Sequence, residues 1–275
     1  MLGARSRERP GKVSRMKHRD VTRAVLVLGM LCAAGASSAG IGLRVQGGYG
    51  YIGYGDYNDR IEYLNGEYFP MMSIDGTLDE FHWVPEISGG VFMPLASRFD
   101  LEIGAGFIWG TREFSIEPVG YLYEHSVRTY PFTATVRASL PVSFMSAKPY
   151  AFAGVGAYYA TLGFTYGTPA AATSFDADLS AWGFGAHGGV GLEIPLAPKA
   201  SLEVGVKGRI APIHGFEGTK TWGGGKTEDI FLAYGTDEDG NLIYEPRPVS
   251  ERDAFDEGTL DMSGVTFHVG ITVLF

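Results

Sequence analysis

Apolar and polar residues alternate along the final segment of the chain, residues 263–275. The odd positions are all apolar and the even positions are mostly small or polar; the apolar set is Val265, Phe267, Val269, Ile271, Val273 and Phe275. A period of two predicts a strand with one apolar face. The strand runs to a terminal aromatic residue with no polar tail, which is unusual for the frayed end of a soluble domain. Such a strand is expected in a closed barrel that shows lipid an apolar face.

The same pattern predicts seven further strands. With the last one they cover about 41–54, 82–95, 99–115, 126–142, 149–165, 179–194, 201–214 and 261–275. Short connections near 95–98, 143–148 and 195–200 alternate with long ones at 55–81, 116–125, 166–178 and 215–260. This alternation predicts an all-β fold, an eight-stranded antiparallel up-and-down transmembrane β-barrel with long extracellular loops. Pro85, Pro131 and Pro212 are expected where strands meet the long-loop rim, because a closed barrel has no edge strand for proline.

The apolar faces of these strands carry aromatics near their long-loop ends. An interfacial girdle is predicted from Tyr49, Tyr51, Trp83, Trp109, Tyr130 and Trp182. Periodicity alone does not separate this arrangement from a soluble barrel whose apolar face points inward to a ligand. The girdle, an export signal and the terminal Phe275 favour the membrane. For 149–165 both faces are small or apolar, so its orientation stays open.

The opposite faces carry charges of both signs. We predict an interior charge network of Arg44, Glu86, Asp100, Glu102, Arg137, Glu193, Glu203, Lys207 and Arg209, with Gln46, His187 and His268 on the same face. The interior of an eight-stranded barrel is only wide enough for side chains to fill it. Unpaired buried charge is very costly, so these residues are expected to pair and form a plug rather than a conducting lumen.

The N-terminus has the pattern of a signal peptide, predicted over residues 1–39 with the barrel domain over 40–275. Basic residues around Lys17 and Arg19 precede a short apolar run, 24–36, and small residues follow up to Ala39. Met16 is the alternative start. Cys32, the chain's one cysteine, lies in the removed segment, so the exported chain forms no disulfide. The first 39 residues hold eight of the 22 basic and two of the 31 acidic residues, which leaves a net charge of −15 and argues against nucleic-acid binding.

Candidate chemistry is sparse. His268 shares a strand face with Thr266 and Thr272, but that face points inward, whereas acyl hydrolysis at a membrane needs a Ser–His pair facing lipid or the rim. His268 and His187 are therefore interpreted as interior hydrogen-bonding residues, and His82, His125 and His214 as rim or loop residues. We predict no catalytic residue, no cofactor and no metal site. Segment 237–241 is interpreted as a hairpin tip, with a weak cation site as the alternative, because the calcium-loop spacing fails. The glycine-rich segment 222–227 is interpreted as a flexible loop.

The signal peptide, eight alternating strands, short turns and terminal VGITVLF together resemble the small outer-membrane β-barrel superfamily, of the OmpA-barrel, OmpX and OmpW kind, over about residues 40–275. The resemblance implies a bacterial outer-membrane location and insertion by the barrel-assembly machinery. That machinery recognises a C-terminal strand ending in an aromatic, a signal matched by Phe267, Val269, Ile271, Val273 and Phe275.

Three functions remain open from the sequence. The first is a non-enzymatic, plugged barrel with a structural or surface-recognition role carried by loops 55–81 and 215–260, which mix aromatics such as Tyr57, Phe69 and Phe231 with acids. The second is a narrow channel for small or apolar solutes, and the third a lipid-modifying enzyme. Outer-membrane lipid and the assembly machinery are expected partners, with a possible extracellular partner at the acidic loops. We expect a monomer.

Overall fold

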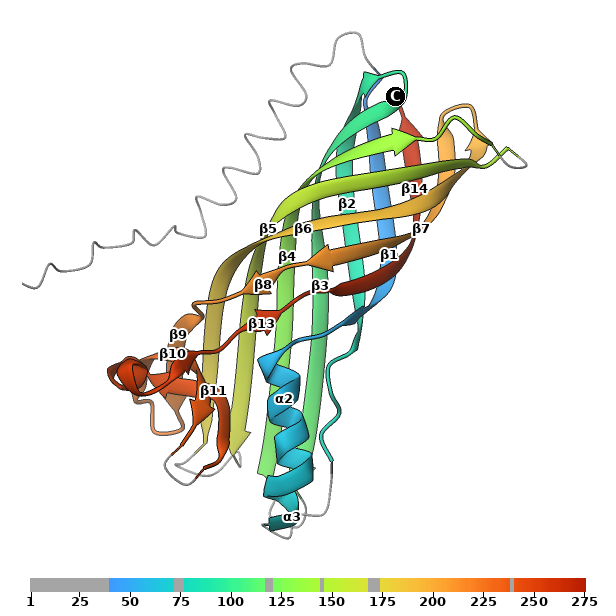
Figure 1. Cartoon of the computed structure of the whole chain (residues 1–275). Helices are drawn as coiled ribbons and strands as arrows, with labels where there is room; N and C mark the ends of the chain where they lie inside the picture. The colour runs from blue at the N-terminus through green and yellow to red at the C-terminus, as the bar shows by residue number, and fades with distance from the viewer. Residues whose placement is uncertain (1–39, 72–76, 117–120, 144–145, 168–173, 238–239) are drawn as a thin grey trace, which may run out of the picture. The chain divides into compact units, whose positions relative to one another are not determined.

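The computed structural model describes residues 40–71, 77–116, 121–143, 146–167, 174–237 and 240–275 (Figure 1). The predicted signal peptide, residues 1–39, lies outside the described residues. The remainder of the chain, Ile41–Phe275, is one compact unit.

Eight strands of this unit pair into a closed antiparallel ring. They are β1 (Gly42–Ile52), β2 (Trp83–Ala96), β3 (Phe99–Ile116), β4 (Tyr121–Ser139), β5 (Lys148–Gly167), β6 (Phe175–Ala197), β7 (Ala200–Ile210) and β14 (Gly264–Leu274). Each strand pairs with its neighbours in the chain, and β14 closes the ring by pairing with both β7 and β1. The prediction of an eight-stranded up-and-down barrel is confirmed.

Strands β3 to β6 extend further toward the long loops than the sequence suggested. β4 begins at Tyr121 rather than near 126, and β6 begins at Phe175 rather than near 179. Pro131 consequently lies inside β4 and not at its rim, so that expectation was wrong. Proline has no N–H to donate, and the pairing of β3 with β4 is interrupted between the pairs Ala105↔Phe132 and Ile108↔Thr129. The pairing of β4 with β5 continues through Pro131.

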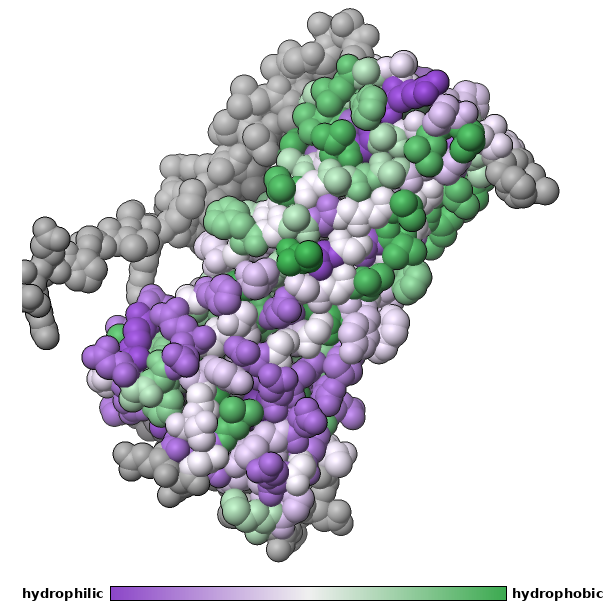
Figure 2. Space-filling view, viewed as in Figure 1, coloured by the Kyte–Doolittle hydropathy of each residue, from purple (hydrophilic) through white to green (hydrophobic). Residues whose placement is uncertain are grey.

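The outer face of the ring is apolar. Phe184 and Ile210 are 79% and 70% exposed, whereas Arg137 and Glu203 on the opposite face are 2% and 0% exposed. Figure 2 shows green apolar atoms over the short-turn part of the barrel and purple polar atoms over the long-loop part. On β1 the outward residues from Leu43 to Tyr51 span about 20 Å of barrel height, close to the apolar band of about 25 Å in such barrels. The apolar face of the ring therefore points outward, and the buried charges lie on the inner face.

The predicted aromatic girdle forms a line of ring contacts across the outer wall. Tyr49 stacks on Trp83 with centroids 5.7 Å apart. Farther along the wall, successive contacts join β3 to β6: Phe107–Trp109, Phe107–Tyr130, Tyr130–Tyr159 and Tyr159–Trp182. Aromatic rings with a polar edge favour the membrane–water boundary, so this line marks the long-loop edge of the apolar band.

The segment expected as loop 55–81 is partly helical. It contains α2 (Asp56–Tyr63), the π-helical turn η1 (Leu64–Tyr68) and the short α3 (Phe69–Met71). Asn58 attaches α2 to the barrel rim: its side-chain amide donates to the carbonyls of Gly53 and Phe81, and its side-chain oxygen accepts from the Phe81 N–H at 3.0 Å. α2 buries Tyr57, Ile61 and, just beyond it, Leu64.

The segment expected as loop 215–260 is also structured. It contains β9 (Glu217–Trp222), β10 (Thr227–Thr236), β11 (Leu242–Pro248), the 3-10 turn η2 (Val249–Ala254) and β12 (Asp256–Glu257). β9 pairs with the extension of β6 and continues that sheet into β10 and β11. The small sheet of β8 (Pro212–Ile213) and β13 (Leu260–Asp261) joins this region to the ring. The hairpin between β10 and β11 was predicted and is confirmed.

These two segments form an apolar cap over the long-loop half of the interior. The cap buries Tyr57 and Ile61 of α2 with Ile230, Leu232 and Tyr244 of the β10–β11 hairpin. From the barrel wall it buries Val84, Ile108, Val127, Leu162, Phe164 and Leu179. The face of β5 that the sequence left open is now assigned, because Tyr158, Leu162 and Phe164 are buried while Val155 is 64% exposed. The sequence suggested charge throughout the interior, but only the short-turn half is charged.

Candidate functional site

The interior below the cap holds two charge clusters, and the first is centred on Glu203 of β7. Its carboxylate pairs with Arg44 Nε at 3.0 Å and with Arg137 Nη1 at 2.6 Å. The two arginines reach outward to further carboxylates, Arg44 to Glu102 and Arg137 to Glu193. Two cations therefore share three carboxylates in this cluster.

Polar side chains complete the coordination of Glu203. Thr272 of β14 donates its hydroxyl to Oε1 at 2.6 Å, and Gln46 of β1 donates its amide to Oε2 at 3.3 Å. The Tyr150 hydroxyl lies 3.5 Å from Oε2, and the Arg137 guanidinium lies over the Tyr150 ring. Tyr150 was not predicted as a site residue, because the inner face of its strand was not assigned from the sequence.

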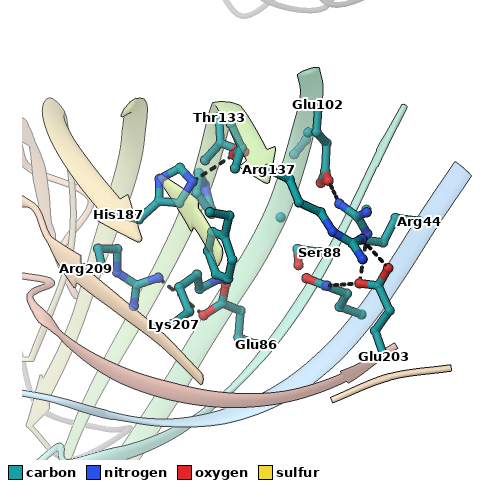
Figure 3. Close-up of a pocket in the computed structure, with 18 of the residues that line it drawn as sticks. Arg44, Glu86, Ser88, Glu102, Thr133, Arg137, His187, Glu203, Lys207 and Arg209 are labelled. Carbon is teal, nitrogen blue, oxygen red and sulfur yellow. Dashed lines mark hydrogen bonds and ion pairs between the residues drawn. The ribbon is translucent and has the colours of Figure 1, made fainter. Parts of the chain in front are cut away.

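The second cluster is centred on Glu86 of β2. Lys207 pairs with its Oε1, and Arg209 Nη1 lies 3.3 Å from its Oε2. The Thr266 hydroxyl donates to Oε2 at 3.2 Å, and Arg209 Nε donates to the carbonyl of Met262 at 2.9 Å. Figure 3 shows the two clusters side by side across the lumen, with His187 next to the Glu86 cluster.

Eight of the nine predicted network residues form ion pairs, and Asp100 is the exception. In the described part of the chain Asp100 makes no ion pair and its side chain is only partly buried. It pairs in register with Pro94, near the short turns at the end of the ring. In the β3–β4 register Asp100 lies directly opposite Arg137, whose guanidinium pairs with Glu193 and Glu203 instead.

Glycines on the inner wall make room for the large polar side chains. A Cβ on Gly90 would approach Glu102 Oε1 to 2.7 Å. A Cβ on Gly154 would lie 2.7 Å from the His187 ring, and one on Gly205 would lie 2.7 Å from the His268 ring. Glycines on the inner wall therefore lie where the long polar side chains of neighbouring strands need space, and those side chains fill the lumen.

A cavity of about 60 Å³ lies between the two clusters. Its charged lining is Arg44, Glu86, Glu102, Arg137, Glu203, Lys207 and Arg209, and its other side chains include Ser88, Thr133, Thr135, Phe152, Tyr158 and His187. The space is sufficient for about four water molecules at about 10–15 Å³ each. It is too small for a sugar or an amino acid.

The histidines do not form a hydrolytic site. His268 is buried in the lumen with Nε2 3.5 Å from the Tyr150 hydroxyl, and His187 Nε2 lies 2.8 Å from the Thr135 hydroxyl. His125 was expected at the rim, but it is buried under the cap between Tyr57 and Phe164. The error arose because β4 begins at Tyr121, so that His125 lies within the strand on its buried face. Among the described histidines none pairs with a serine on the lipid-facing wall.

Several aromatics assigned to the recognition loops are core residues instead. Tyr57, Phe69 and Phe231 are 2%, 6% and 0% exposed, so they are not available to a partner. Acids on the same helical segment stay at least partly exposed: Asp59, Glu62 and Glu67. Because these segments are folded into helix and strand, their aromatic side chains point into the cap and their acidic side chains point to solvent. The composition of a loop does not reveal this arrangement.

The hairpin tip at 237–241 is held by its own side chains. The Asp237 carboxylate accepts from the backbone N–H and from the side-chain amide of Asn241. Residues 238 and 239 lie outside the described residues. Within the described ranges there is no group of three or more His, Cys, Asp or Glu side chains arranged to hold a metal ion. In the same ranges no helix is long and apolar enough to cross a bilayer.

Comparison with known structures identifies the fold. A major outer membrane protein from Thermus thermophilus superposes with a TM-score of 0.52 at 12% identity, covering 86% of this chain and 99% of that one. OprG from Pseudomonas aeruginosa gives 0.43 at 11% identity, covering 85% and 95%, and Neisserial surface protein A gives 0.39 at 10%, covering 86% and 97%. No family model and no curated protein matches the sequence.

The closed ring, its apolar outer band and the likeness to the Thermus protein together show that the chain has the fold of a small outer-membrane β-barrel.

Proposed function

We propose that the protein is a non-conducting, non-enzymatic outer-membrane barrel whose cap presents an acidic surface for recognition. The observation that carries the first part is the filling of the lumen in two layers. The paired charges around Glu203 and Glu86 fill the short-turn half, and the apolar cap fills the other half. An ion or polar solute would have to pass both layers.

The cap makes the seal stronger than a charge network alone. Tyr57 and Phe81 lie 5.0 Å apart in an edge contact, and Tyr57 meets Tyr244 of the hairpin at 5.5 Å. Ile61, Phe81 and Tyr244 are 3%, 0% and 1% exposed. Packing of this density, in the described part of the cap, supports a seal against hydrated solutes.

Solute entry into proteoliposomes tests the seal. Vesicles containing the refolded residues 40–275 should swell in isotonic arabinose or glycine no faster than empty vesicles. A general porin in parallel vesicles serves as the positive control. Swelling faster than the empty vesicles would contradict the proposal.

The two alternative functions lack a supporting contact. A lateral exit for apolar solutes needs a stretch of wall whose strands are not paired. On one edge of β6 such a stretch lies between the residues that pair with β9 and those that pair with β7. It is covered by β8, since a Cβ added to Gly183 would lie 2.8 Å from the Ile213 side chain. A lipid-modifying enzyme needs a nucleophile and a base on the lipid-facing wall, and the described histidines do not supply that pair.

The recognition role is supported by the charge distribution of the cap. Arg247 and Arg252 are already paired with Glu245, Glu251, Glu217 and Glu257. Further acids of the cap lie exposed and have no ion pair among the described residues, among them Asp59, Glu62, Glu67 and Asp253. An acidic surface selects a basic partner and accelerates its association.

A labelled lysine decapeptide is a suitable probe of this surface. Binding of the peptide to proteoliposomes should weaken in Glu62→Gln/Glu67→Gln, and should weaken for all variants as salt is raised. The matched control is Asp176→Asn/Asp178→Asn, which removes two acids from β6, away from α2. Equal affinities for the cap variant and the control would show that the cap is not a selective surface.

A further inference from the structure

The short-turn end of the barrel carries one exposed cation at each of its three connections. Arg98 lies in the turn between β2 and β3, Lys148 is the first residue of β5, and Lys199 lies in the turn between β6 and β7. All three residues are exposed, and none makes an ion pair among the described residues. They are called the basic rim below. Because whole strands separate the three connections, the basic rim is distributed around the ring.

The charges of the interior do not neutralise the basic rim. The nine residues of the interior network are five carboxylates and four cations, so the described short-turn half holds seven cations and five carboxylates in all. Lys148 lies opposite Glu193 in the β5–β6 register, but Glu193 pairs with Arg137 instead. The carboxylate of Phe275 also lies at this end, next to the Ile41 carbonyl that accepts from its N–H. With that carboxylate counted, the balance stays positive.

This balance is opposite to that of the barrel domain as a whole. Residues 40–275 contain 14 basic and 29 acidic residues. The described short-turn half accounts for half of the basic residues but for only five of the acids. The negative charge of the domain is therefore concentrated toward the cap, and the two ends of the barrel differ in sign.

Exposed apolar side chains accompany the basic rim. Leu95, Val142 and Leu196 are exposed, one beside each short connection. In Figure 2 strongly hydrophilic atoms lie among green apolar atoms at this end. The apolar band of such a barrel lies in the hydrocarbon of a bilayer, and long basic side chains beside it reach into the headgroup layer. The basic rim therefore lies at the level of the lipid phosphates.

We propose that the basic rim binds the headgroups of anionic phospholipids in the leaflet that surrounds the short turns. Guanidinium and ammonium groups both donate hydrogen bonds to phosphate oxygens, and the fork of Arg98 can engage two oxygens at once. A zwitterionic headgroup carries its own ammonium, whereas phosphatidylglycerol carries none, so the rim selects lipids with net negative charge. The apolar residue beside each cation favours a lipid over a soluble polyanion. This proposal is independent of the recognition role proposed for the cap.

Site-specific fluorescence quenching tests the basic rim. The barrel domain has no cysteine, so Ser97→Cys places one label beside Arg98, and Ser180→Cys places one at the long-loop edge, opposite Glu217 in the β6–β9 register. Each labelled barrel is refolded in phosphatidylcholine vesicles that contain nitroxide-labelled phosphatidylglycerol or, at the same mole fraction, nitroxide-labelled phosphatidylcholine. At Ser97→Cys, phosphatidylglycerol should be preferred by about two- to fivefold in relative association. The preference should fall as salt is raised and should be absent at Ser180→Cys.

A rim variant and a matched cap variant define the site. In the Ser97→Cys background, Arg98→Gln/Lys199→Gln should lower the preference to about one. The control Lys226→Gln/Arg252→Gln removes two cations from the cap region, changes the net charge equally and should keep the preference. Heat-modifiable mobility on gels establishes that each variant is folded. Because the domain is negative overall, its net charge alone should repel phosphatidylglycerol. A wild-type label at Ser97→Cys that shows no preference, or a preference of the same size in the rim and cap variants, would overturn the proposal.

Discussion

Arg137 lies between Glu193 and Glu203, with the Tyr150 ring against its guanidinium. Its side chain is 3% exposed, and that of Glu203 is fully buried. A pair in this setting contributes little when intact, because desolvation offsets the attraction, but removal of one partner leaves a buried charge. The residue is therefore a sensitive reporter of whether the lumen is closed to water.

Arg137→Ala should lower the free energy of unfolding by about 3–5 kcal/mol. Urea-induced unfolding in phospholipid vesicles measures the loss. Arg252→Ala is the control, because its partners Glu217 and Glu257 are about half exposed and screened by solvent, and it should cost at most about 1 kcal/mol. Similar losses in the two variants would mean that water reaches Glu203.

Tyr244 supplies a test of the cap at high pH. Burial under the cap, with a smaller contribution from Asp56, raises the pKa of its hydroxyl well above the ordinary value near 10. In the unfolded chain the hydroxyl ionises near pH 10, so the folded state binds more protons above that pH and loses stability as pH rises. The urea midpoint should fall between about pH 9.5 and about pH 11.5, and Tyr244→Phe should flatten that decline. An unchanged slope in Tyr244→Phe would assign the decline to other groups.

Much of the residue-level arrangement follows from alternation. The inward position of Arg44, Glu86 and Glu203 could be predicted because each is flanked by outward apolar residues. The sequence predicted that Arg137, Lys207 and Arg209 would pair with carboxylates of this set, but which carboxylate each cation meets could not be predicted, since that depends on which strands face each other across the ring. Tyr150 and His125 were missed because β5 has two faces of similar polarity and because the strands continue past the apolar band.

Helix α2 shows how an element can be hidden in a loop. Segment 55–81 has the aromatics and acids of a surface loop, yet Asn58 makes three hydrogen bonds to rim backbone and is largely buried. The helix is stabilised by this attachment and by burial of Tyr57 and Ile61 rather than by its eight residues alone, since isolated helices of this length are marginal in water.

Asn58→Ala should detach α2 while the ring stays closed. It leaves the Phe81 N–H and two carbonyls without the side-chain partner, at a cost of about 1–3 kcal/mol for each group left buried and unpaired. Trypsin should then cut after Arg60 at least several times faster, while the heat-modifiable mobility of the folded barrel is kept. Glu62→Gln, a change on the same helix away from the rim contacts, should cut at the wild-type rate. Equal rates for both variants would show that Asn58 does not hold the helix.

Deletion of the terminal residue Phe275 should affect the rate of assembly much more than the stability of the folded barrel. Phe275 is 66% exposed on the outer wall, and its N–H donates to the carbonyl of Ile41 at 2.9 Å. Its deletion removes one rim side chain from lipid contact, at most a few kcal/mol by area. We expect assembly in cells to slow strongly while the unfolding midpoint of the assembled barrel changes little. Equal assembly rates for the deletion and the wild type would show that this residue is not the recognition signal.

At the scale of the whole molecule, the number of ring strands and the alternation of short and long connections were predictable from the sequence. The cap was not, because 215–260 has polar hairpin tips and acids that hide Phe216, Ile230 and Leu232, each of which is at most 1% exposed. In this segment apolar and polar residues alternate over strands so short that the pattern does not distinguish them from turns. The interior is therefore not charged throughout: its short-turn half holds the ion pairs, and its long-loop half is closed by the apolar cap.

Single-channel recording in planar bilayers tests the central claim, a lumen closed by network and cap, most directly. Wild-type residues 40–275 at high salt should give no steady conductance steps. A variant that replaces 216–259 with a short Gly/Ser turn removes half of the cap but no ring strand, and should give brief, small openings through the charged half alone. Large, steady currents from the wild-type barrel would contradict the account.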